Sequence, residues 1–185
     1  MSKRKPHRAD WSNKKYTTIP PTLIQQQSYS NVVELRLTNN ALKELPWDIL
    51  AQAMPNLRSL WLNRNEFADI PAGITQLSVL RKLHLEDNKI TTITPQISKL
   101  EELRKLYLNN NKLIQLPPEM HKLAQLTRLN VSNNSLKIIP SEFHCLTQLK
   151  TLNIDNNPVI SPPPFMCTSG TIPLLNFLRQ QYDSL

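Results

Sequence analysis

Residues 80–90, LRKLHLEDNKI, are followed after 23 positions by the closely similar LRKLYLNNNKL at residues 103–113. Both follow the pattern L-x-x-L-x-L-x-x-N-x-L, which occurs six times and also covers residues 32–42, 57–67, 126–136 and 149–159. The first two copies start 25 residues apart, and each later pair starts 23 residues apart. Self-similarity at so regular a period predicts a solenoid of stacked repeats.

The alternation of apolar and polar residues in L-x-L is typical of a short strand. One copy cannot bury its own leucines, so the next copy must stack on it about 4.8 Å away and pair with it in parallel. We therefore expect buried leucine columns, one of them through Leu60, Leu83 and Leu106. The asparagine shared by all copies, such as Asn88, is expected to hydrogen-bond the backbone where the chain leaves the strand.

A second apolar segment follows each asparagine and usually begins with Leu-Pro or Ile-Pro, or with Ile-Thr-Pro at residues 93–95. Proline has no N–H to donate and favours the first turn of a helix. We therefore expect short helical turns on the convex side, with a fuller α-helix in WDILAQAMPNL (47–57). The pattern predicts a curved α/β horseshoe whose concave face is a parallel sheet of about six strands.

Both ends of such a solenoid need caps, because a terminal repeat otherwise exposes its leucines. TTIPPTLIQQQ (17–27) matches half a repeat and is expected to form a helical N-terminal cap. The proline run at 162–164 is expected to stop regular structure. Gly170 is expected to precede a helix that faces the last repeat with Leu174, Leu175 and Leu178.

The net charge of +8 is unevenly distributed. Residues 1–15 hold six basic residues and one acid, Asp10, for a net +5, and the remainder of the chain contributes +3. We expect a disordered basic tail at 1–16, repeats with their N-terminal cap at 17–159, and a helical C-terminal cap at 160–185. The mildly basic body does not by itself indicate nucleic-acid binding, which we regard as disfavoured.

Two cysteines, Cys145 and Cys167, are too few for a disulfide framework and favour reduced thiols. The first residues lack the apolar run of a secretory signal, and no stretch approaches the roughly 20 apolar residues of a membrane-spanning helix. We therefore expect a cytoplasmic protein. Nuclear import through the basic tail, or delivery into the cytosol of a host cell, are the alternatives.

The sequence disfavours an enzyme and indicates no cofactor. It has only two glycines and contains no H-E-x-x-H, no G-x-S-x-G and no glycine-rich phosphate loop. His121, His144 and Cys145 lie in neighbouring repeats, but no fourth ligand has a zinc-like spacing, so we expect no metal site. His84 and Glu86 share a strand face, but no nucleophile accompanies this acid–base pair.

The outward positions between the leucines form columns across the concave sheet, and these are the candidate binding surface. Aromatic residues and arginine at the centre of a surface are typical of protein interfaces. Flanking basic residues favour an acidic or phosphorylated partner. The predicted partner-binding residues are Arg36, Trp61, His84 and Tyr107 in the middle column, Lys82, Lys105 and Arg128 before it, and Glu86 after it.

Two alternatives to binding stay open on this face. The column residues can serve only to cover the sheet, without a partner. One position before the basic column, a further set of charges lines the edge and is interpreted mainly as a solubilising row: Arg58, Arg81, Arg104 and Lys150.

The 23-residue unit resembles the Ras-group type of leucine-rich repeat, over roughly residues 19–182. The closing N-P-x-x-x-P-P…G…L-x-x-F-L-R segment resembles the cap of Ras-suppressor and Roco-like proteins. The resemblance implies a non-catalytic adaptor or scaffold that binds another protein on its concave face, with a small GTPase or another signalling component as the implied partner. A bacterial effector that imitates host repeat proteins is one alternative. Binding of nucleic acid or an anionic surface through SKRKPHR (2–8) is another.

Overall fold

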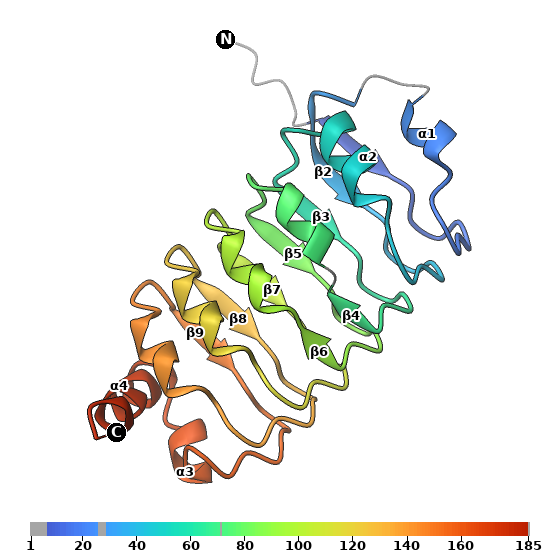
Figure 1. Ribbon diagram of the computed structural model, residues 1–185. Coiled ribbons are helices and arrows are strands. Elements are labelled where there is room, and N and C mark those ends of the chain that lie inside the picture. Colours follow the sequence, from blue (N-terminus) through green and yellow to red (C-terminus); the bar gives the residue numbers. More distant parts are fainter. Residues whose placement is uncertain (1–6, 26–28, 71, 185) are drawn as a thin grey trace.

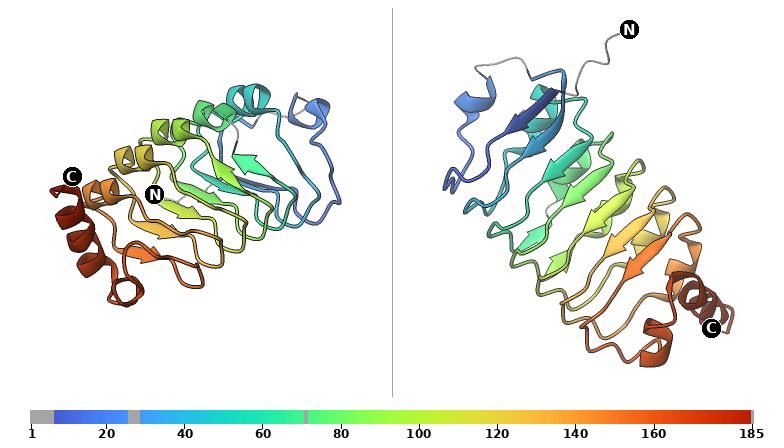
Figure 2. Two further views of the ribbon diagram at one scale, coloured as in Figure 1. Left: turned by 60° about the horizontal axis from the view of Figure 1, so that its bottom comes forward. Right: turned by 180° about the vertical axis from the view of Figure 1, so that it is seen from behind.

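The computed structural model describes residues 7–25, 29–70 and 72–184. Within these residues the chain coils into a curved solenoid, with strands along one face and helical turns along the other (Figures 1 and 2). The described concave sheet has seven strands, one more than expected, and every pair is parallel. The strands are β1 (His7–Asp10), β2 (Val32–Arg36), β3 (Ser59–Trp61), β5 (Lys82–His84), β7 (Lys105–Tyr107), β8 (Arg128–Asn130) and β9 (Thr151–Asn153).

The leucine column expected from the pattern forms the spine of the core. Leu60, Leu83 and Leu106 are in register on β3, β5 and β7, and none of them is exposed. The column continues to Leu129 and ends at Leu152, which is only partly buried because β9 is the last strand. The predicted parallel stacking is therefore confirmed.

β1 corrects the expectation that residues 1–16 form a disordered tail. Ala9 lies in register with Leu35 and is buried, and the Trp11 N–H donates to the Arg36 carbonyl over 2.8 Å. The N–H of Tyr16 donates to the side-chain oxygen of Asn40 over 3.1 Å, as the N–H of Leu42 does to Asn65 in the next repeat. Residues 7–25 thus form a degenerate repeat in which alanine, tryptophan and tyrosine replace leucines. The rest of the expected tail, residues 1–6, lies outside the described residues.

Helical turns cover the convex side, as the proline pattern predicts. The segment after Pro46 is an α-helix, and Pro95 and Pro118 begin 3₁₀ helices. A small second sheet pairs β4 (Asp69–Ile70) with β6 (Thr92–Ile93). The convex helices are α1 (Pro21–Gln25), α2 (Trp47–Ala53), η1 (Ala72–Gln76), η2 (Pro95–Lys99), η3 (Pro118–Lys122) and η4 (Ser141–Cys145).

Each repeated asparagine joins two successive repeats through the backbone. The amide nitrogen of Asn88 donates to the carbonyls of Leu62 and Leu85, each over 3.0 Å, and its oxygen accepts from the Phe67 N–H over 3.1 Å. The equivalent bonds recur at Asn65, Asn111, Asn134 and Asn157. These asparagines therefore have the structural role predicted for them.

Two helices close the C-terminal end: α3 (Pro164–Cys167) and α4 (Thr171–Tyr182). The hydroxyl of Thr171 accepts from the Leu152 N–H over 3.0 Å, which pairs a backbone donor of the last strand. Leu174 and Leu178 are buried, and Leu175 packs partly against the core. The proline run does not simply end regular structure, because Pro164 begins α3 at a position where no backbone N–H is needed. No helix in the described ranges is long and apolar enough to cross a membrane.

Candidate interaction surface

The four middle-column residues expected from the sequence form one continuous stack. Trp61 and His84 lie face to face with ring centroids 3.6 Å apart and an interplanar angle of 4°. His84 and Tyr107 stack at 4.5 Å and 18°, and the guanidinium of Arg36 lies 5.0 Å from the Trp61 ring centroid. In-register strands β2, β3, β5 and β7 place these side chains about one strand spacing apart, which brings the rings into contact.

His84 differs from the exposed residue that the sequence suggested. Only 8% of it is exposed, because the rings of Trp61 and Tyr107 cover both of its faces. Its Nδ1 lies 2.9 Å from an oxygen of Glu86, so the carboxylate is turned towards the imidazole. A contact surface centred on this stack is therefore presented by the partly exposed Trp61 and Tyr107, with His84 between them.

Two buried polar atoms near the stack have no hydrogen-bond partner among the described residues: Nε1 of Trp61 and Oε2 of Glu86. An unpaired buried polar atom costs about 1–3 kcal/mol. At Trp61 and Glu86 the concave face therefore has a lower stability than fully paired polar atoms would give.

The stack has an acidic neighbour on β1. Asp10 lies in register with Arg36. Burial by itself raises the pKa of Asp10, but hydrogen bonds from Ser12 and the charges of Arg8 and Arg36 outweigh it, so its pKa lies below the ordinary value. The middle column therefore begins with a carboxylate and continues into a cation–aromatic stack.

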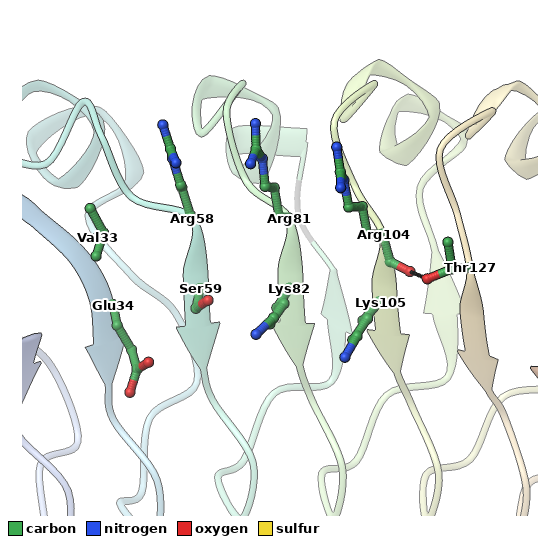
Figure 3. A pocket seen from close by; sticks show the side chains of 9 residues that line it. All are labelled: Val33, Glu34, Arg58, Ser59, Arg81, Lys82, Arg104, Lys105 and Thr127. Atoms are coloured by element: carbon green, nitrogen blue, oxygen red, sulfur yellow. Dashed lines mark hydrogen bonds between the residues drawn. The ribbon is translucent and has the colours of Figure 1, made fainter. Parts of the chain in front are cut away.

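A pocket of about 670 Å³ opens beside the stack, at the amino-terminal ends of the central strands (Figure 3). It unites Lys82 and Lys105, predicted as partner-binding residues, with the arginine row that the sequence analysis interpreted as solubilising. Arg128 pairs in register with Lys105 but does not line the pocket. The lining residues are Val33, Glu34, Arg58, Ser59, Arg81, Lys82, Arg104, Lys105 and Thr127.

The two histidines of the convex side, His121 and His144, contact nearby backbone carbonyls, and Sγ of Cys145 lies 3.3 Å from Nε2 of His144. Nδ1 of His121 lies 2.8 Å from the carbonyl of Pro118, and Nδ1 of His144 lies 2.8 Å from that of Ser141. In the described part of the chain, no group of three or more His, Cys, Asp or Glu side chains is arranged to hold a metal ion. Both cysteines are free, and burial raises the pKa of the Cys167 thiol.

The family model for leucine-rich repeats matches residues 30–90, 55–113 and 101–159, which together cover more than half of the chain. This chain is a leucine-rich-repeat protein. The family is one of interaction modules, and the match indicates no catalytic family. A search of curated proteins by sequence returns no significant match.

Solved structures of bacterial leucine-rich-repeat proteins resemble this repeat protein. A leucine-rich-repeat protein of Leptospira interrogans is 32% identical over 78% of this chain, with a TM-score of 0.60. The internalin InlF of Listeria monocytogenes is 25% identical over 82% of this chain, with a TM-score of 0.68. Internalin C2 of the same species is 24% identical over 86% of this chain, with a TM-score of 0.71, and shows likeness of fold alone. This chain spans 42% of each of the first two and 66% of the third.

Proposed function

We propose that the concave face of this leucine-rich-repeat protein is a non-catalytic binding surface for another protein. The observation that carries the proposal is the stack of Arg36, Trp61, His84 and Tyr107 at the centre of the sheet. Aromatic and arginine side chains in such a position are the usual energetic anchors of protein interfaces.

The stack also suits binding because it is already ordered. Each ring holds its neighbour in place, and the His84–Glu86 hydrogen bond fixes the central imidazole. A partner that packs on Trp61 and Tyr107 therefore pays little conformational entropy to order them. The neighbouring cations Lys82, Lys105 and Arg128 support a partner with an acidic or phosphorylated surface.

We further propose that the protein is a cytoplasmic adaptor of the Ras-suppressor-like type with a Roco-like cap. Its proposed partner is a small GTPase or another signalling component. The support for this assignment is the 23-residue period, together with short 3₁₀ helices on the convex side. Two free cysteines, one of them exposed, support a reducing compartment.

The test is a capture experiment with purified protein and a cell lysate, in which Trp61→Ala/Tyr107→Ala is compared with the wild type. We expect the double variant to lose the proteins that the wild type retains, because both anchors are removed. Circular dichroism checks that the fold is intact, which we expect since both side chains are partly exposed. The proposal is wrong if wild type and double variant retain the same proteins in equal amounts.

A matched control removes two apolar side chains elsewhere. Ile114 and Ile138 are 59% and 57% exposed and lie outside the concave strands. We expect Ile114→Ala/Ile138→Ala to capture the same proteins as the wild type.

A bacterial effector that acts inside a host cell is a second candidate. It is favoured only by likeness to bacterial repeat proteins, and a reporter fusion that detects transfer into host cells tests it. Nucleic-acid or anionic-surface binding through the basic amino terminus has no such support. Arg8 lies in β1, 3.9 Å from Glu34, where it is part of the sheet.

A further inference from the structure

The basic pocket at the amino-terminal ends of β3, β5 and β7 is a second feature of the same sheet (Figure 3). We propose that this pocket binds a short extended segment of a partner protein that is rich in aspartate and glutamate. The inference rests on the proposed function and deepens it, because it assigns a partner chemistry to a surface that contains none of the stacked rings.

The pocket has an excess of positive charge. Five cationic side chains line the pocket against one carboxylate, Glu34, and that carboxylate already accepts a hydrogen bond from Arg36 over 2.7 Å. Arg81 is paired with Glu102 at 3.1 Å. No carboxylate in the described residues lies within ion-pair distance of the other four cations, which are Arg58, Lys82, Arg104 and Lys105.

These unpaired cations repel one another across the pocket. An anionic ligand relieves this repulsion and gains charge-assisted hydrogen bonds from the guanidinium groups. The pocket is therefore complementary to negative charge rather than simply polar.

The arrangement of the cations distinguishes between anionic ligands. The N–H of Arg81 donates to the carbonyl of Arg58, and the N–H of Arg104 donates to that of Arg81, so the three arginines form a row across the strands. Figure 3 shows their side chains pointing the same way, while Lys82 and Lys105 point the opposite way. Parallel rows do not converge on one point, as donors around a single phosphate group must. They suit charges spread along a chain.

The size of the pocket sets the length of the segment. The arginine row crosses two strand spacings, or about 10 Å, which about three extended residues span. With contacts beyond both ends of the row, a segment of about four to six residues fills the site.

A single-stranded nucleic acid also spreads its charges, but the surroundings favour a polypeptide. Sites for single strands combine cations with aromatic faces on which bases stack. None of the nine described residues that line this pocket is aromatic, and the nearby rings of Trp61 and His84 stack on each other with centroids 3.6 Å apart. Backbone and carboxylate groups of a peptide need no such platform.

The test is fluorescence anisotropy with three labelled probes: hexaglutamate, hexaglutamine and a six-nucleotide oligothymidylate. We expect wild-type protein to bind hexaglutamate in preference to the other two, with an affinity that falls as salt rises. Arg58→Gln/Arg104→Gln is expected to weaken hexaglutamate binding by about tenfold or more, since two charge-assisted contacts are lost.

The matched control is Lys99→Gln/Lys122→Gln, which removes two exposed charges from the convex side. We expect it to stay within about twofold of the wild type, because affinity depends on the pocket rather than on net charge. Equal loss in the two double variants overturns the proposal. Failure of the wild type to bind hexaglutamate, or tighter binding of the oligonucleotide, also overturns it.

Trp61→Ala/Tyr107→Ala separates this inference from the proposed function. We expect this variant to bind hexaglutamate like the wild type while losing captured partners. If it keeps its partners but hexaglutamate binding depends on the arginines, the stack is not the partner site and the acidic-segment site stands. If hexaglutamate binding does not depend on the arginines but partner capture depends on the stack, only the acidic-segment site fails.

Discussion

In each of the six repeats, from β2 onwards, the turn after the concave strand depends on two adjacent residues. The second is the asparagine that bonds two repeats together, and the first has a left-handed backbone. Asp87, for example, has a φ of 56° before Asn88. Asparagine and aspartate tolerate this conformation better than other residues with a side chain, and they fill the first position in every repeat but one. The exception is Arg64, with a φ of 56°.

We predict that Arg64→Asn stabilises the protein by about 0.5–1 kcal/mol, because asparagine adopts the left-handed conformation at lower cost than arginine. The exposed Arg64–Asp87 contact, at 3.7 Å, is lost, but such surface pairs contribute only about 0–1 kcal/mol. The new amide can replace it, as Asn110 bonds Asp87 over 2.7 Å. Denaturant unfolding measures the change.

The reverse substitution is the control. Asn110 has a φ of 58°, and Asn110→Arg is expected to destabilise the protein through the same backbone cost and the lost bond to Asp87. If Arg64→Asn is no more stable than the wild type, the left-handed backbone does not select the residue at this position.

Among the strands of the concave sheet, β1 is the one that the repeat pattern missed. Its inward residues are Ala9 and Trp11 instead of leucines, so the eleven-residue pattern does not extend to them. A signal was nevertheless present, since Ala9 stands 26 residues before Leu35 and Ile19-Pro20 matches Leu45-Pro46. The pairing of β1 with β2 is visible only in the structure, where alanine and tryptophan take the places of the two leucines.

We predict that Ala9→Glu lowers the free energy of unfolding by about 2–3 kcal/mol, because it places a carboxylate at a site that is only 7% exposed. Thermal and denaturant unfolding provide the measurement. Lys14→Gln is the control, since it also lowers the net charge by one but changes an exposed side chain. Equal stability of Ala9→Glu and Lys14→Gln would mean that β1 is not part of the folded core.

The candidate interaction surface was also predicted only in part from the strand pattern. The alternation of residues along the strands predicted which side chains project from the concave face of the sheet, including those of Trp61 and Tyr107. It did not predict that His84 would be buried between them, because ring stacking depends on the rotamers of three strands together. The row of Arg58, Arg81 and Arg104 was predicted, but only as a solubilising row. That it lines one pocket together with Lys82 and Lys105 depends on how the side chains of three neighbouring strands are arranged.

The whole molecule is a linear stack in which a repeat contacts mainly its neighbours. A leucine in the middle of the stack has a strand on each side, whereas one in the last repeat has a strand on one side and a cap on the other. Leu106 is fully buried between Leu83 and Leu129, while Leu152 stays partly exposed next to the C-terminal cap.

We predict that Leu106→Ala lowers the free energy of unfolding by about 3–4 kcal/mol, because it leaves a cavity between two repeats. Leu152→Ala is expected to cost about 1–2 kcal/mol, since less apolar surface is buried there and the end can relax. Denaturant unfolding of both variants tests the difference. Equal losses would contradict a stack whose ends are looser than its centre.

The repeat period, the parallel sheet, the convex turns and the outward columns follow from the sequence by itself. They arise from a regular spacing of leucine, asparagine and proline, which can be read within each copy of the repeat. The strand β1, the buried imidazole and the basic pocket were decided only by the tertiary structure. Each depends on side chains about 23 to 26 residues apart in the sequence, whose contacts exist only after one repeat has stacked on the next.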